Sequence, residues 1–146
     1  MEQRISLITL GVRDLARSRA FYEALGWRGQ EVQETVFFQA GGQGLVLWSR
    51  GKLAADCGVD DTGEPGFGGI TLAHNVRSAA EVDELMAAAR DAGARITKPA
   101  THSELGFYTG VFLDPDNHPW EIAHNPGFPL SADGSLTIPD LSLPET

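Results

Sequence analysis

The order of apolar and polar positions predicts a strand followed by a helix at the start of the chain. ISLITLGV (5–12) is an apolar, β-branched run of the kind that forms a buried strand. The next segment, DLARSRAFYEALG (14–26), places its large apolar side chains near one helical face. Asp14 can cap the first amides of this helix, and Gly26 stands where a left-handed residue would end it.

Three more strands are predicted before residue 51. ETVFFQA (34–40) and GLVLWSR (44–50) flank Gly41-Gly42-Gln43, which is a hairpin signal, and a weaker strand is predicted at 27–33. The same order then returns. A strand at 68–76 is followed by a helix that opens on a Ser78/Glu81 capping box, and then by strands at 94–99, 106–114 and 119–124.

The pattern therefore predicts an α+β fold with an internal structural repeat. We expect a first module at 1–50, a linker at 51–67, a second module at 68–125 and an extended tail at 126–146. Between the last two strands, Asp114-Pro115-Asp116-Asn117 has the residues of a type I turn.

Length, net charge and cysteine content exclude several classes of protein. The 146 residues suffice for one domain with a core or for two small fused modules. A net charge of −9 argues against binding to a nucleic-acid backbone, and no apolar run is long enough to span a membrane. The start of the chain does not resemble a secretory signal, so we expect a cytoplasmic protein. The single cysteine, Cys57, cannot form an internal disulfide or a cysteine-rich zinc site.

Two stretches carry a family resemblance. ITLGVRDLARSRAFYEALGW and DPDNHPWEI, within a repeat over about 4–125, resemble the vicinal oxygen chelate superfamily of glyoxalase I, bleomycin-resistance proteins and extradiol dioxygenases. The resemblance implies two βαβββ modules whose sheets curl into a half-open barrel with a central cavity, and it implies a homodimer. It does not specify a reaction, since one fold hosts many functions.

In the metal-dependent members of this superfamily, each module supplies two ligands, from its first and last strands. The matching positions here are Leu7, the GLVLWS strand (44–49) with Leu47, Gly69 and Glu121. Only Glu121 has a ligand-type side chain, whereas a transition metal is usually held by three or four protein ligands. We therefore expect no metal and no cofactor.

The four histidines are the other side chains that could replace these ligands. Odd separations along a strand point to opposite faces, so His124 and His74 should turn away from a cavity that Glu121 faces. His118 lies in the predicted turn and is expected to be solvated. His102, in the 101–107 loop, could border the mouth of the cavity and contact a ligand or transfer a proton.

Without metal ligands, the cavity is expected to be apolar with one acid. The candidate ligand-binding residues are Leu7, Phe38, Leu47, Trp48, His102, Phe107, Tyr108 and Glu121. Alternation allows only one of Phe37 and Phe38, and one of Leu47 and Trp48, to face the cavity. Glu121 is either a hydrogen-bonded structural group, a contact to a ligand or a general base, and it is the first candidate for a catalytic residue.

Three functions remain open. The first is a metal-free binding protein that captures a small, partly aromatic ligand, as in antibiotic sequestration. The second is a metal-dependent lyase, transferase or dioxygenase of the glyoxalase type. The third is a cofactor-free isomerase or lyase with Glu121 or His102 as its base.

Overall fold

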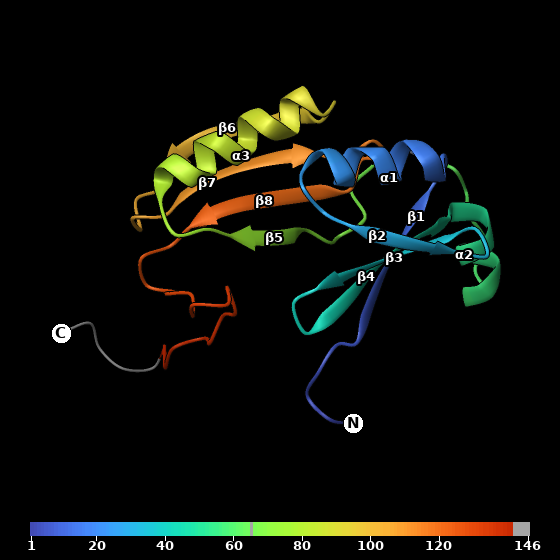
Figure 1. The fold of residues 1–146 in the computed structure, drawn as a ribbon, viewed down its shortest axis with the longest axis horizontal. Coiled ribbons are helices and arrows are strands. Elements are labelled where there is room, and N and C mark those ends of the chain that lie inside the picture. The colour runs from blue at the N-terminus through green and yellow to red at the C-terminus, as the bar shows by residue number, and fades with distance from the viewer. Residues whose placement is uncertain (65, 142–146) are drawn as a thin grey trace.

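Two four-stranded sheets lie side by side in the computed structural model, which describes residues 1–64 and 66–141 (Figure 1). Sheet A has the strand order β1-β4-β3-β2, and sheet B repeats it as β5-β8-β7-β6. Sheet A is built from β1 (Leu7–Val12), β2 (Gly29–Val32), β3 (Thr35–Ala40) and β4 (Gln43–Ser49). Sheet B is built from β5 (Leu72–Asn75), β6 (Arg95–His102), β7 (Tyr108–Leu113) and β8 (Pro119–His124). The predicted α+β fold of two βαβββ modules is confirmed.

Helices α1 (Leu15–Ala24) and α3 (Ala79–Asp91) lie on the same side of the two sheets (Figure 1). Both begin at the predicted caps, since the side chain of Asp14 accepts from the amide of Arg17 at 3.0 Å and Ser78 accepts from the amide of Glu81 at 3.1 Å. Gly26 follows α1 with a φ of 100°, a left-handed value that favours glycine and ends the helix.

The largest departure from the predicted elements lies in the linker. Residues 50–57 form a further helix, α2 (Arg50–Cys57), which packs against β1 and β4 where a connection without regular structure was expected. Ser49 caps this helix through the amide of Lys52, and Gly58 ends it in the left-handed region at φ 69°. None of the helices in the described part of the chain is long and apolar enough to span a membrane.

Three strand boundaries also move. β5 starts at Leu72, because Gly69 before it has a φ of 80°, which is outside the extended region. β7 starts at Tyr108, two residues after a second positive-φ glycine, Gly106. β6 continues to His102 instead of ending near residue 99, with register irregularities along its pairing with β7.

The tail turns back on itself near the second module. Leu130 and Leu136 form an isolated β-bridge, and the guanidinium of Arg77 donates to the backbone carbonyls of Ser131 and Ala132. The end of the predicted tail, residues 142–146, lies outside the described residues.

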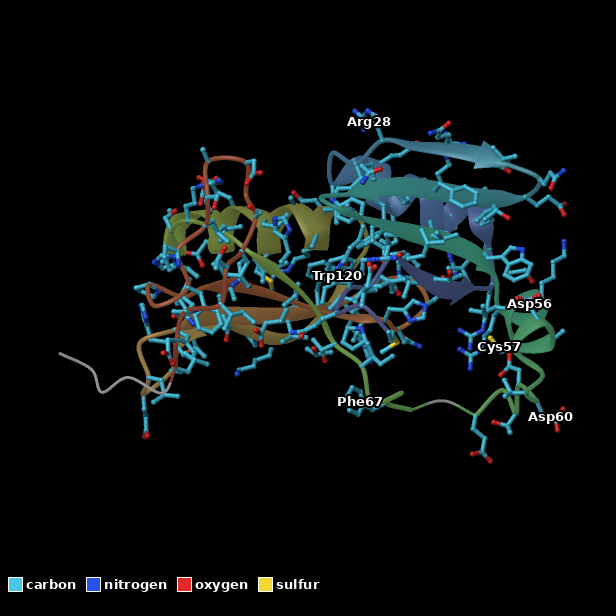
Figure 2. The ribbon with its side chains drawn as sticks, turned by 90° about the horizontal axis from the view of Figure 1, so that it is seen from below. Arg28, Asp56, Cys57, Asp60, Phe67 and Trp120 are labelled. Carbon is cyan, nitrogen blue, oxygen red and sulfur yellow. The ribbon has the colours of Figure 1, made fainter. Side chains whose placement is uncertain are left out.

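One core joins the two modules. It combines side chains from α1 and sheet A with others from sheet B, and Phe21 of α1 meets Phe112 of β7 at a ring-centroid distance of 6.1 Å. Trp120 lies at the centre of the molecule, where the modules meet (Figure 2). The indole N–H of Trp120 donates to the hydroxyl of Tyr22 at 3.1 Å, and this hydroxyl donates to Asp114 Oδ2 at 2.6 Å.

The turn after β7 completes this joint. Asp114 Oδ1 accepts from the amides of Asp116 and His118, both at 2.8 Å, which holds the predicted turn in shape. Asp116 in turn accepts from the amide of Arg13 at 2.9 Å. His118 Nε2 lies 2.9 Å from the carbonyl oxygen of Gly11, so the expectation of a solvated His118 is wrong. Its ring is half-buried and links the two modules.

Candidate functional site

Each sheet has one face that packs under a helix and one that does not, and the strand register tells them apart. In β1, Leu10 and Val12 are buried in the core, so Leu7 and Thr9 belong to the opposite face. We call the two faces turned away from α1 and α3 the open face. Candidate side chains must lie there to contact a ligand in the cavity between the sheets.

The open-face position on β4 is Val46 and not Leu47. Leu47 pairs with Leu10 and Val36, and its exposed fraction is 0% within the core. Val46 pairs with Thr9 and therefore shares its face. The expectation that Leu47 faces the cavity is wrong by one residue, and Trp48, the next alternate position, stays with Val46 on the open face.

Between Phe37 and Phe38, the residue on the open face is again the neighbour of the one expected there. Phe38 is 2% exposed and lies in the core, 5.5 Å from the ring of Trp27. Phe37 is 40% exposed and pairs with Val46 on the open face. Phe38, which was the expected ligand contact, is therefore a packing residue, and its neighbour Phe37 is the aromatic side chain available to a ligand.

Glu121 lies on the open face of sheet B. Its neighbours Trp120 and Ile122 are both core residues, which turns the carboxylate of Glu121 the other way. The side chain is half-buried, and no hydrogen bond or ion pair reaches it from the described residues. His74 and His124 are placed on the helix side, as their spacing predicted, since His74 pairs with Ile122.

Two candidates near the β6–β7 turn, His102 and Tyr108, lie away from the open face, and a third, Phe107, lies in the turn itself. Tyr108 donates its hydroxyl to Asp83 of α3 at 2.6 Å, so its side chain is on the helix side. This hydrogen bond raises the pKa of Tyr108. The ring of His102 lies 4.7 Å from that of Tyr108, on the same side. Phe107 is half-buried in the turn, where its amide donates to Ser103 Oγ. The expected places of His102 and Tyr108 at the cavity are therefore corrected.

A hollow of about 430 Å³ lies over the N-terminal part of sheet A. Its lining includes the exposed side chains of Leu7 and Phe37, with the polar groups of Arg4, Gln30 and Gln43 around them. Sequence reasoning did not single out this polar rim. Arg4 precedes β1, Gln30 lies on β2 and Gln43 begins β4, so only the strand order β1-β4-β3-β2 brings these three residues together.

The residues present do not fit the metal centre of the superfamily. On the open face the positions given by the resemblance are Leu7, Val46 in place of Leu47, and Glu121, whereas Gly69 lies before β5 and outside the sheet. Of these residues, only Glu121 offers a ligating side chain. Among the described residues, no three His, Cys, Asp or Glu side chains gather where they could hold a metal ion. The chemistry open to this face is therefore apolar contact and hydrogen bonding, with one carboxylate.

Comparisons with known proteins agree with this fold. The model of the Glyoxalase/Bleomycin resistance protein/Dioxygenase superfamily matches residues 4–122. A glyoxalase-related enzyme from Fulvimarina pelagi is 42% identical, with a TM-score of 0.85 over 93% of this chain and 98% of its own. The fosfomycin resistance protein FosX from Mesorhizobium loti shares the fold at 21% identity, with a TM-score of 0.64 over 86% of this chain and 94% of its own. Lactoylglutathione lyase from Agrobacterium tumefaciens does so at 21% identity and a TM-score of 0.64, over 85% and 95%. No curated protein sequence matches the chain.

A match over 4–122 covers most of the chain, and both modules lie almost wholly within it. The chain belongs to the Glyoxalase/Bleomycin resistance protein/Dioxygenase superfamily.

Proposed function

We propose that this protein binds a small, partly aromatic molecule on its open face without the help of a metal ion. The observation that carries the proposal is that Leu7 and Val46 occupy open-face positions where the resemblance implies metal-binding groups, and that Gly69, just before β5, has no side chain to offer. The hollow combines the exposed side chains of Leu7 and Phe37 with a polar rim, and this mixed lining suits a flat amphipathic ligand.

The charge of the protein favours a ligand with a cationic or hydrogen-bonding group. The net charge is −9, and the carboxylate of Glu121 has no partner among the described residues. A half-buried acid is more stable when a donor or a positive charge faces it. We infer that Glu121 is that ligand's polar contact.

We further propose that the protein acts as a homodimer. Sheets A and B lie side by side in one chain and leave their open faces without a helix, so a second copy could cover part of them (Figure 1). Ile5, Leu7 and Phe37 are exposed apolar side chains on or next to sheet A, and Phe67 projects from the linker (Figure 2). Light scattering is expected to give twice the mass of the chain, and a monomer at all concentrations would contradict this.

A thermal-shift screen of aromatic and cationic natural products tests the binding proposal. We expect at least one compound to raise the unfolding midpoint, and Glu121→Gln to weaken that compound's binding. Glu84→Gln is the matched control, because Glu84 is an exposed acid on α3. If no compound stabilises the protein while some substrate is turned over, the proposal is wrong.

A metal-dependent lyase, transferase or dioxygenase is the second candidate. It is favoured by the 42% identity to a protein named as a glyoxalase-related enzyme. The open face offers this activity a single ligand, Glu121. A third candidate, a cofactor-free isomerase or lyase, uses Glu121 as a base. Glu121→Gln would then abolish turnover and not merely change affinity.

A further inference from the structure

A second cavity lies on the helix side of sheet B, away from the open face. It has a volume of about 80 Å³ between the end of α1, helix α3 and the sheet. Its walls are mostly rings, from Tyr22, Trp27, Phe112 and Trp120, with Leu25 and Leu85 closing the ends. The rings of Trp27 and Trp120 meet edge to face at 5.9 Å. We call this cavity the aromatic recess.

The aromatic recess is not a sealed packing defect. Trp27, His74 and Trp120 also line a larger cleft of about 710 Å³, so the two hollows adjoin at these three residues, and His74 there is exposed to solvent. The cleft lies between the two modules, with Gln39 and Gln43 of the β3–β4 hairpin on one side and Thr71 near β5 on another. A molecule can therefore reach the aromatic recess from solvent.

His74 is the polar group at the mouth of the aromatic recess. It is on the helix side of β5, and its imidazole forms no hydrogen bond with any described residue. The ring keeps an exposed edge, while the surrounding protein removes enough water to lower its pKa. A neutral imidazole donates one hydrogen bond from its protonated nitrogen and accepts one at the other nitrogen.

We propose that the aromatic recess is a second binding site, for a neutral single-ring molecule that carries a hydroxyl group. Its volume is about half that of the roughly 150 Å³ apolar cavities that hold benzene, so the leading edge of one ring fits and the rest remains in the cleft. The rings of Trp27 and Trp120 can pack edge to face or offset against an aromatic ring of the ligand. The hydroxyl reaches His74 at the mouth, and this site does not depend on the function proposed for the open face.

Benzyl alcohol is the probe, and the indole N–H signals of the three tryptophans report its position by NMR. We expect the signals of Trp27 and Trp120 to shift saturably, while Trp48, on the open face of sheet A, stays constant. Shifts that are largest at Trp48, or that do not saturate, would overturn the proposal.

Two variants sharpen the test. Leu85→Phe fills the aromatic recess and should abolish the saturable shift, whereas Leu105→Phe makes the same change at an exposed turn and should preserve it. His74→Ala should weaken benzyl alcohol by about 2- to 10-fold, the worth of one hydrogen bond, and should leave toluene unaffected. Equal binding by Leu85→Phe and Leu105→Phe, or equal losses for both probes in His74→Ala, would refute the site.

Discussion

Tyr22→Phe tests the joint between the two modules, because the hydroxyl of Tyr22 is buried there between two partners. It donates to Asp114 Oδ2 at 2.6 Å and accepts from Trp120 Nε1 at 3.1 Å. Phenylalanine keeps the ring contacts but leaves a buried carboxylate oxygen and a buried indole N–H unpaired. Each unpaired group costs about 1–3 kcal/mol, with the carboxylate at the upper end and the indole N–H at the lower end, so we expect a loss of about 4 kcal/mol.

Tyr108→Phe is a closely matched control. Tyr108 also donates to an aspartate at 2.6 Å, but this bond to Asp83 is exposed to water. Water can replace the lost hydroxyl there, so the effect on stability should be much smaller. Urea unfolding measures both variants, and the midpoint should fall for Tyr22→Phe with little change in slope. If the two substitutions lower the free energy of unfolding equally, the hydroxyl of Tyr22 does not hold the modules together.

Two further predictions follow from packing and from pH. Gly110→Ala should destabilise the protein by about 1–3 kcal/mol, because the added methyl would lie 2.8 Å from Met86 Cε and 3.2 Å from the amide nitrogen of Ala100. Gly51→Ala, where the added methyl has no neighbour within 4 Å, should not destabilise the protein, and thermal unfolding followed by calorimetry measures both variants. Burial first, and then the Asp114 carboxylate, raise the pKa of Tyr22 far above its ordinary value. The unfolded chain therefore loses this proton near pH 10 while the folded chain keeps it, so the stability advantage of wild type over Tyr22→Phe should shrink above about pH 10 and stay constant below. An advantage that grows above pH 10 would contradict this assignment.

The repeat could be read from the sequence because its signals are local. Asp14 and Ser78 cap the two long helices as their positions predicted, and Gly26 ends the first one. Helix α2 was missed because no strong apolar periodicity marks it and none of its residues is buried. Its caps, Ser49 and Gly58, were the available signal.

The open face was harder to predict because a one-residue slip exchanges the two faces of a strand. The motif Val36-Phe37-Phe38 is apolar throughout, so alternation alone could not say which ring is buried. The register with β4 decides it, and register is a property of the folded sheet. The family resemblance placed Glu121 at the cavity, and the structure puts it on the open face, between Trp120 and Ile122, which both belong to the core.

His118 shows a second limit of sequence reasoning. It follows a turn, where a polar side chain is normally solvated, but its partner is the carbonyl oxygen of Gly11 in the other module. A contact across 107 residues leaves no local pattern in the sequence. The same holds for Asp116 and the amide of Arg13.

Metal binding by the untagged, chelator-treated protein tests the central claim most directly. Calorimetric titration with Ni²⁺ and Zn²⁺ is predicted to show no stoichiometric site, because Leu7, Val46 and Gly69 contribute no ligand beside Glu121. One ion bound per chain, and lost on Glu121→Ala, would contradict the account and favour a metal-dependent enzyme.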